Sequence, residues 1–456
     1  MSSTERPSYL EKASRFVCDT RLEDLSSAAR ERGRWVIADS IPVIAAGMRA
    51  AEMGALVSRH LANAAPGNAW VIGTGKRAAA LDAALLNGTA GTWLELDEGN
   101  LFAKGHPGIQ VVPAALAAAQ DIGASGADLV LAVTLGYEIS ARISRAANVR
   151  LSVHPHGTYG VIGAAIAVGK LRKLDQPQMR ELLNVAATMG MATSRRTLLE
   201  GSTVRNIYTG HSGYMGQMAV RLVESGFTGE PDGVGSVYGG GVLSEAFDRE
   251  RVVAQLGEEW LITKSYFKLH CAGRYAHSAI DALEDALAKV PEKRIEPARI
   301  ARIDVDAYSL AAMLNGKNIT TSFGTRFSVP FALASILYHG KSGLSSFDEQ
   351  AVANPAVQSL VSRVFVTENP SYTAAFPEKQ FCDVAITLTD GAVITGRCEV
   401  TKGEPANPHK PEELKGKFFE LGTPAWGDAV TQKLYDGLMN LEGIADFRAF
   451  ADELAL

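Results

Sequence analysis

Three carboxylates and a histidine stand close together in the sequence, at Glu95, Asp97, Glu98 and His106, with Asn100 between them. Acid–base chemistry needs such a mixture, because burial and neighbouring charges push the pKa values of similar groups apart. The alternative is a solvated loop whose carboxylates cap the flanking helices, since runs of charge are usually exposed. This segment is therefore the first candidate for a catalytic site.

A second polar segment holds two histidines, His154 and His156, ahead of an alanine-rich stretch. Histidine titrates near neutral pH, so either ring could move a proton in a reaction. The His-x-His spacing could also ligate a metal, but no His-Glu-x-x-His motif or carboxylate-rich partner accompanies it. We therefore expect proton transfer and no metal, with a structural or surface role as the alternative.

Two later segments supply positive charge. Arg205 lies among glycine, serine and threonine residues, where its guanidinium could bind a carboxylate through two hydrogen bonds. Lys268, Cys271 and His277 follow at a change in composition, and such a junction is a plausible place for a cleft. Ordinary surface positions are the alternative for both cations. Cys271 lacks the sequence signature of a nucleophilic cysteine, so we expect no thiol chemistry from it.

Composition and missing motifs exclude several classes of protein. The 456 residues carry 45 Lys and Arg against 50 Asp and Glu, a net charge of -5, so no basic face for nucleic acid is expected. The four cysteines form no Cys-x-x-Cys pair. In a chain of this length we expect them to be reduced thiols. No phosphate loop, dinucleotide fingerprint, signal peptide or membrane-spanning run is found. We expect a cytoplasmic protein without cofactor, nucleic-acid partner or membrane contact.

The elements that must position these residues are mainly helices. Alanine and leucine recur at helical spacing through the first half of the chain. Small residues are dense there, which would let neighbouring helices pack closely. The spacing predicts helices over residues 41–64, 78–86, 112–121, 127–146 and 160–171.

The pattern changes near residue 266. Period-two alternation predicts a strand over residues 299–306, and Asp390-Gly391 predicts a hairpin between residues 382–388 and 392–400. A helix over residues 329–338 carries a proline in its first turn, and helical spacing returns over residues 410–456. The sequence therefore predicts a mainly α protein. It combines a large all-helical domain, residues 1–266 together with 403–456, with a smaller, lid-like α+β domain over residues 267–402.

A series of different short motifs lies along residues 20–400. They are Asn87-Gly88-Thr89, Leu94-Glu95-Leu96-Asp97-Glu98-Gly99, His106-Pro107-Gly108, Gly136-Tyr137-Glu138, Arg142-Ile143, His154-Pro155, Gly160-Val161-Ile162-Gly163-Ala164-Ala165, Arg205 with Gly210, Gly226-Phe227-Thr228-Gly229, Lys268 with Cys271 and His277, and Phe327-Ser328-Val329-Pro330. Each is short, but the ordered set resembles the MmgE/PrpD family. That family includes 2-methylcitrate dehydratase, cis-aconitate decarboxylase and iminodisuccinate epimerase.

The resemblance implies a homodimer with its active site in a cleft between a helical and an α+β domain. Carried over by position, it makes Asp97, His106, His154 and Lys268 catalytic and places Glu95, Asn100, Arg205 and His277 at the substrate. The family usually has Asp where this chain has Glu95 and Lys where it has Arg205. Many bacterial members have His at the position of Asn100. One expectation that follows from these departures is a substrate other than methylcitrate or cis-aconitate.

The family's reactions share one physical problem, which is to break a bond to a carbon beside a carboxylate. Cations must stabilise the charge that builds up, and a histidine must transfer the proton. We expect Arg205 and Lys268 to do the first, and His106 and His154 the second. The leading hypothesis is a cofactor-independent hydro-lyase that dehydrates a small hydroxy di- or tricarboxylic acid. An isomerase or epimerase, a decarboxylase of a related polycarboxylate, and a non-catalytic ligand-binding protein are the alternatives.

Overall fold

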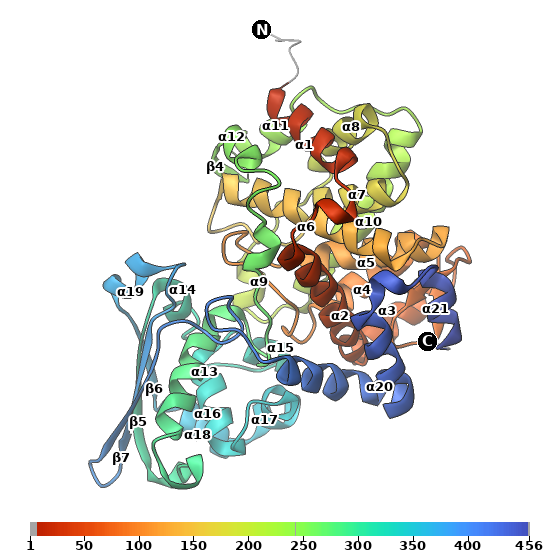
Figure 1. Ribbon diagram of the computed structural model, residues 1–456. Helices are drawn as coiled ribbons and strands as arrows, with labels where there is room; N and C mark the ends of the chain where they lie inside the picture. The colour runs from red at the N-terminus through yellow and green to blue at the C-terminus, as the bar shows by residue number, and fades with distance from the viewer. Residues whose placement is uncertain (1–6, 242, 455–456) are drawn as a thin grey trace.

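The computed structural model describes residues 7–241 and 243–454 (Figure 1). It is 59% helical and 11% strand, so the predicted mainly α class is confirmed. The predicted helical domain also includes residues 1–6, 242 and 455–456, which lie outside the described residues.

The helices before residue 266 pack around one extended apolar core. α7 is buried along almost its whole length, and Gly163 lets α6 approach it, because a Cβ there would lie 2.6 Å from Ser140 Oγ. The helices of this part are α1 (Ser8–Asp19), α2 (Ser27–Met48), α3 (Ala51–Leu61), α4 (Ala80–Gly91), α5 (Pro107–Ile122), α6 (Gly126–Ala146), α7 (Gly160–Leu171), α8 (Gln176–Ala187), α9 (Arg196–Leu199), α10 (Ile207–Glu224), α11 (Gly233–Gly239) and α12 (Arg249–Val253).

The single helix predicted over residues 41–64 is wrong, because the chain bends by 91° between α2 and α3. Ala50 is extended at the bend, and only Met53 and Val57 of α3 are then buried. If α3 continued straight on from α2, Met53 and Val57 would not reach the core. Within the described residues no single helix has the length and apolar character of a membrane span, and α2 with α3 reaches that threshold only as a bent pair.

A four-stranded sheet forms the second part of the molecule, at the lower left of Figure 1. Its strand order is β6-β5-β7-β8, in which only β5 and β6 run parallel. Alternate residues of β7 are buried where α13 crosses the sheet. The strands are β5 (Ile300–Ala307), β6 (Val364–Glu368), β7 (Cys382–Leu388) and β8 (Val393–Cys398). The helices here are α13 (Arg274–Leu287), α14 (Ser309–Ala312), α15 (Ser322–Thr325), α16 (Val329–His339), α17 (Glu349–Ala353), α18 (Pro355–Ser362) and α19 (Pro370–Ala375).

The predicted strand, hairpin and proline-led helix of this part are all confirmed, as β5, β7 with β8, and α16. Gly391 has a φ of 86° in the hairpin turn, a conformation that favours glycine. Two short ribbons lie in the helical part, β1 (Ala69–Val71) with β2 (Lys76–Ala78) and β3 (Ala147–Val149) with β4 (Ser244–Phe247). The 3-10 helices are η1 (Leu22–Asp24), η2 (Thr203–Asn206), η3 (Leu261–Lys264), η4 (Pro291–Lys293), η5 (Pro297–Arg299), η6 (Leu344–Phe347) and η7 (Leu441–Gly443).

The C-terminal helices return to the first part of the chain. α20 (Pro411–Met439), blue in Figure 1, packs along α2, and α21 (Phe447–Glu453) packs on α5. Lys417 of α20 is buried, with its ammonium 2.5 Å from a carboxylate oxygen of Asp39 in α2. The same ammonium donates a hydrogen bond of 2.6 Å to the carbonyl of Leu96. This buried pair therefore ties α2 and α20 to the acidic segment that the sequence singles out.

Two glycines bring α4 and α10 into direct backbone contact. A Cβ on Gly88 would lie 2.8 Å from Cα of Gly210, so neither position has room for a side chain. Thr209 donates a hydrogen bond of 2.6 Å from its hydroxyl to the carbonyl of Gly88 across the same contact. α4 leads into the acidic segment and α10 begins just after Arg205.

We predict that Lys417→Met destabilises the fold by about 3–5 kcal/mol, because it leaves the buried Asp39 carboxylate without its partner. Adding Asp39→Asn removes both charges and should recover much of that loss. Urea unfolding of the two variants measures the difference. Lys415→Met, at an exposed position of the same helix, is the control. A double variant as unstable as the single one would contradict the prediction.

Candidate active site

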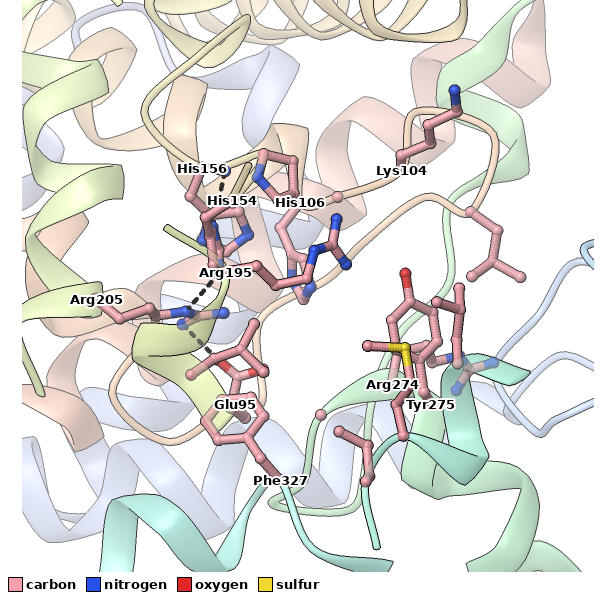
Figure 2. Close-up of a pocket in the computed structure, with 18 of the residues that line it drawn as sticks. Glu95, Lys104, His106, His154, His156, Arg195, Arg205, Arg274, Tyr275 and Phe327 are labelled. Carbon is pink, nitrogen blue, oxygen red and sulfur yellow. Dashed lines mark hydrogen bonds and ion pairs between the residues drawn. The ribbon is translucent and has the colours of Figure 1, made fainter. Parts of the chain in front are cut away.

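A pocket opens where the helical part meets the part that carries the sheet, and both parts line it. Its empty space is about 740 Å³ when the open mouth is included. Figure 2 shows Glu95, His106, His154, His156 and Arg205 gathered around this space. The three polar segments named from the sequence before residue 210 therefore meet in one place.

The acidic segment reaches the pocket through a tightly held loop between α4 and α5. Gly99 pairs with Tyr266 by backbone hydrogen bonds, and Asn100 pairs with Gly105. Glu95 has a φ of 54°, a left-handed conformation that is uncommon for a residue with a side chain and is often found at functional sites. The alternative of a solvated loop is wrong, since Glu95, Asp97, Glu98 and Asn100 are all buried. The backbone pairs fix the directions in which these side chains point.

Asp97 and His106 form a close pair beside the pocket. Nδ1 of His106 lies 2.7 Å from Oδ2 of Asp97, and the ammonium of Lys268 lies 3.5 Å from the other carboxylate oxygen. Burial favours the neutral acid, yet His106 and Lys268 together hold the pKa of Asp97 below its usual value. Asp97 is therefore ionised and fixes the orientation of the imidazole. The other ring nitrogen, Nε2, does not take part in this pair, and His106 lines the pocket.

Glu95 neutralises the two cations that the sequence assigns to substrate binding. One carboxylate oxygen lies 2.5 Å from Nη1 of Arg205, and the other lies 3.6 Å from Nζ of Lys268. The Arg205 guanidinium also lies over the ring of Phe327, 5.7 Å from its centre. The two positions at which this chain departs from the usual family residues, Glu95 and Arg205, are thus in direct contact with each other.

His154 and His156 are both buried and neutral. Arg205 donates a hydrogen bond of 3.3 Å to Nε2 of His154, and the backbone amide of His156 donates one of 3.1 Å to Nδ1 (Figure 2). A neutral imidazole accepts at only one ring nitrogen, so the ring can form only one of these two hydrogen bonds at a time, and a doubly protonated ring could form neither. Burial, followed by the charge of Arg205, lowers the pKa of both histidines well below the usual value. The ring of His156 lies 4.9 Å from that of His106, centre to centre.

Glu98 behaves differently from its two acidic neighbours. Burial, together with the charges of Asp97 and Asp39, raises the pKa of its carboxyl well above the usual value. One oxygen accepts a hydrogen bond of 2.5 Å from the backbone amide of Gly108, at the start of α5. Burial therefore favours the neutral form of Glu98, which holds the loop to α5, and the three acids of this segment have separate environments.

Asn100 and His277 are close to the site but are occupied by other contacts. Asn100 lines the pocket, yet its amide donates to the carbonyl of Leu261 and accepts from the backbone of Ala103. His277 does not line the pocket, and its Nε2 lies 2.9 Å from the carbonyl of Ala272. Asp97 and Lys268 lie directly behind lining residues, with at most 1% of either side chain exposed. Buried Cys271 donates to the carbonyl of Leu94, and burial raises the pKa of its thiol, which makes it unreactive.

The structure adds residues that the sequence did not assign. His156 lines the pocket and could have been chosen from the His-x-His pair. Arg195 also lines it, on a segment joined to Val153 by the bridge at Ser194, and no motif marks it. Ligand atoms of His270, Asp281 and Glu284 lie within 4.8 Å of one another, but none of these three residues lines the pocket.

Comparison with known proteins identifies the family of this chain. Residues 11–244 match the MmgE/PrpD N-terminal domain, and residues 270–440 match the MmgE/PrpD C-terminal domain. The chain belongs to the MmgE/PrpD family. The acidic loop, His154 and Arg205 lie within the first matched region, and Lys268 lies between the two regions. The resemblance inferred from the short motifs is therefore confirmed.

Individual relatives from this family are distant but cover most of the chain. Cis-aconitate decarboxylase of Aspergillus terreus is 24% identical over 449 residues, which are 93% of this chain and 91% of that protein. The cis-aconitate decarboxylases of Mus musculus and Homo sapiens are each 24% identical and cover 80% of this chain. The aligned regions span 76% of the Mus musculus protein and 77% of the Homo sapiens protein.

We predict that the buried histidines make the fold sensitive to mild acid. Below about pH 6.5 the unfolded chain takes up a proton on His154, His156 and His277, whereas the folded chain, in which their pKa values are lowered, does not. The free energy of unfolding therefore falls as the pH falls. His156→Asn should make that fall shallower by about 1.4 kcal/mol per pH unit.

Urea unfolding at several pH values between 7 and 5 measures these slopes. The raised pKa of Glu98 acts with the opposite sign in both proteins, so it cancels in the comparison. His60→Asn, at a partly exposed position in α3, is the control. Parallel curves for the wild type and His156→Asn would rule out this linkage.

Proposed function

We propose that this MmgE/PrpD protein is a lyase that removes carbon dioxide from a small unsaturated polycarboxylate. The pair formed by His106 and Asp97 at the pocket carries the proposal. Decarboxylation consumes one proton at carbon, and this pair offers one oriented group to deliver it. The relatives named as cis-aconitate decarboxylases support the same reaction type.

The reaction would proceed by cleavage of a carbon–carbon bond. Carbon dioxide leaves, and the electron pair stays on a carbon that is conjugated with a second carboxylate. Cations near that carboxylate stabilise the charge that spreads into it, an effect that is strong where water is excluded. Protonated His106 then gives its proton to the carbon, and ionised Asp97 supplies the counter-charge.

Glu95 limits what Arg205 and Lys268 can do. In a substrate-free site its carboxylate occupies both cations, so a bound substrate carboxylate would share or replace it. We assign Arg205 and Lys268 to charge stabilisation, as the sequence implies. His154, whose ring accepts from Arg205, then positions that guanidinium rather than transferring a proton. Asn100 and His277 are assigned to holding the loops around the site.

Dehydration, the reaction expected from the sequence, is the second candidate. It needs a base as well as an acid, and His156 favours it because this neutral histidine lies beside His106. Its Nδ1 is buried without a hydrogen-bond partner in the described part of the chain. The homodimer implied by the family resemblance and the cytoplasmic location expected from the composition and missing motifs remain predictions.

Substitutions at the histidines separate these reactions. We expect His106→Asn to lower kcat/KM by about 100- to 10,000-fold, the usual contribution of a positioned acid or base. His156→Asn should leave decarboxylation nearly unchanged but should lower dehydration by a similar factor. His60→Asn is the control for substitution at a site outside the pocket.

The substrates for this test are cis-aconitate, its homologues and the corresponding hydroxy acids, incubated in heavy water and followed by NMR. Release of carbon dioxide with one deuteron gained at carbon supports the proposal. Alkene formation from a hydroxy acid supports dehydration, and inversion without loss of carbon supports an epimerase. No conversion of any acid in the panel would contradict a lyase.

A second prediction concerns the contact between Glu95 and Arg205. Glu95→Asp shortens the acid and weakens its contact with the guanidinium, whereas Glu95→Asp with Arg205→Lys installs both residues usual for the family. We expect the effects of the two changes on the free energy of activation to be non-additive by about 0.5–3 kcal/mol. Arg205→Lys alone should retain more activity than Arg205→Ala, since it keeps the charge.

Steady-state kinetics of the four variants measure this coupling, with circular dichroism confirming that each is folded. Additive losses would mean that the two departures from the family are independent of each other.

A further inference from the structure

One wall of the pocket is apolar. None of its side chains carries a charge or a hydrogen-bonding N–H or O–H group. They are Leu198, Leu199, Leu310, Met313, Leu314 and Phe327. The proposed reaction uses none of them. A small polycarboxylate consists almost entirely of charged and polar groups, so it would give this wall nothing to bury.

The wall is assembled from both parts of the molecule. Leu198 and Leu199 end α9 in the helical part, whereas Leu310 lies in α14, and Met313 and Leu314 directly follow it. Leu198 packs against the core that surrounds the sheet, although it comes from the helical part. The wall therefore continues an apolar contact between the two parts into the open space of the pocket.

Exposure differs strongly along this wall. Phe327 is 7% exposed and Leu314 is 4% exposed, but Leu199 is 41% exposed and Met313 is 39% exposed. The two exposed side chains belong to opposite parts of the molecule and border the same pocket. Apolar area left open at a pocket mouth gains free energy only when a ligand covers it. The apolar lining therefore has a buried end at Phe327 and an open end at Leu199 and Met313.

Phe327 marks the boundary between the charged and the apolar regions. Its ring lies under the guanidinium of Arg205, which pairs with Glu95, while its position on the wall continues toward the leucines. Figure 2 shows Phe327 next to Glu95 and below Arg205, on the side away from His156. A ligand whose carboxylates meet Arg205 would therefore bring its next carbons against Phe327.

We propose that the substrate carries an apolar arm of several carbons, alkyl or aryl, on its polycarboxylate head. The head lies against Arg205 and His106, and the arm passes Phe327 and leaves between Leu199 and Met313. The proposal rests on the proposed function for the head and adds the apolar subsite for the arm.

Binding of unreactive acids tests the arm without relying on catalysis. Tricarballylate is a saturated tricarboxylate that cannot follow the proposed reaction. Its affinity, and that of homologues with methyl, propyl and pentyl chains on a terminal carbon, is measured by isothermal titration calorimetry. We expect the dissociation constant to fall by about fourfold for each methylene that reaches the wall.

Two variants and one control locate the subsite. Leu199→Asn and Met313→Gln place polar groups at the mouth, where both side chains are partly exposed, and should reduce the gain per methylene toward none. Val393→Asn, at an exposed position of β8 outside the pocket, should keep the full gain. An affinity independent of chain length, or a gain that persists in both mouth variants, overturns the proposal.

The same acids in unsaturated form separate this inference from the proposed reaction. If cis-aconitate is decarboxylated and a chain brings no gain in binding, the reaction stands and the arm is refuted. If longer chains bind more tightly but no unsaturated acid is converted, the apolar subsite stands and the proposed reaction is refuted.

Discussion

Glu95, Asp97, Arg205 and Lys268 are withdrawn almost completely from water at one end of the pocket. An ion in such a place loses hydration worth several kcal/mol, and only an opposite charge at short distance can offset that loss. The two acids and two cations satisfy this condition together, since Lys268 contacts both carboxylates. No member can be removed or displaced without leaving another charge uncompensated, so the loops that carry them must meet in one arrangement.

This requirement explains several features around the site. The loop of Glu95 accepts a left-handed backbone conformation, because the ion pair to Arg205 compensates for the strain. Lys417 reaches the carbonyl of Leu96 from the far end of the chain and holds the same loop from behind. His156 and Glu98 lie next to this set, and burial favours the uncharged form of both. The pocket thus has a compensated set of charges at an end from which water is largely excluded, where charges act strongly.

Local patterns in the sequence predicted local structure well. The helix at Gly160–Leu171 and the hairpin at Asp390-Gly391 follow from spacing and turn chemistry that lie within a few residues. The bend at Ala50 could not be predicted in this way, because it depends on where the core lies relative to α3. For the same reason the sequence could name Glu95 and Arg205 as departures from the family but not as partners. Arg195 lines the pocket because the neighbouring Ser194 pairs with Val153, which is distant in the sequence. No local motif marks Arg195.

The contact between Gly88 and Gly210 works as a spacer between the two loops that bear Glu95 and Arg205. Because the helices touch backbone to backbone there, the separation of acid and guanidinium is set outside the pocket, by the absence of two side chains. A methyl group at either position would push the helices apart by more than the tolerance of a short ion pair. A comparison of family members limited to residues that touch substrate would therefore overlook part of what tunes their chemistry. In laboratory evolution, a change at these glycines would act on the site from a distance.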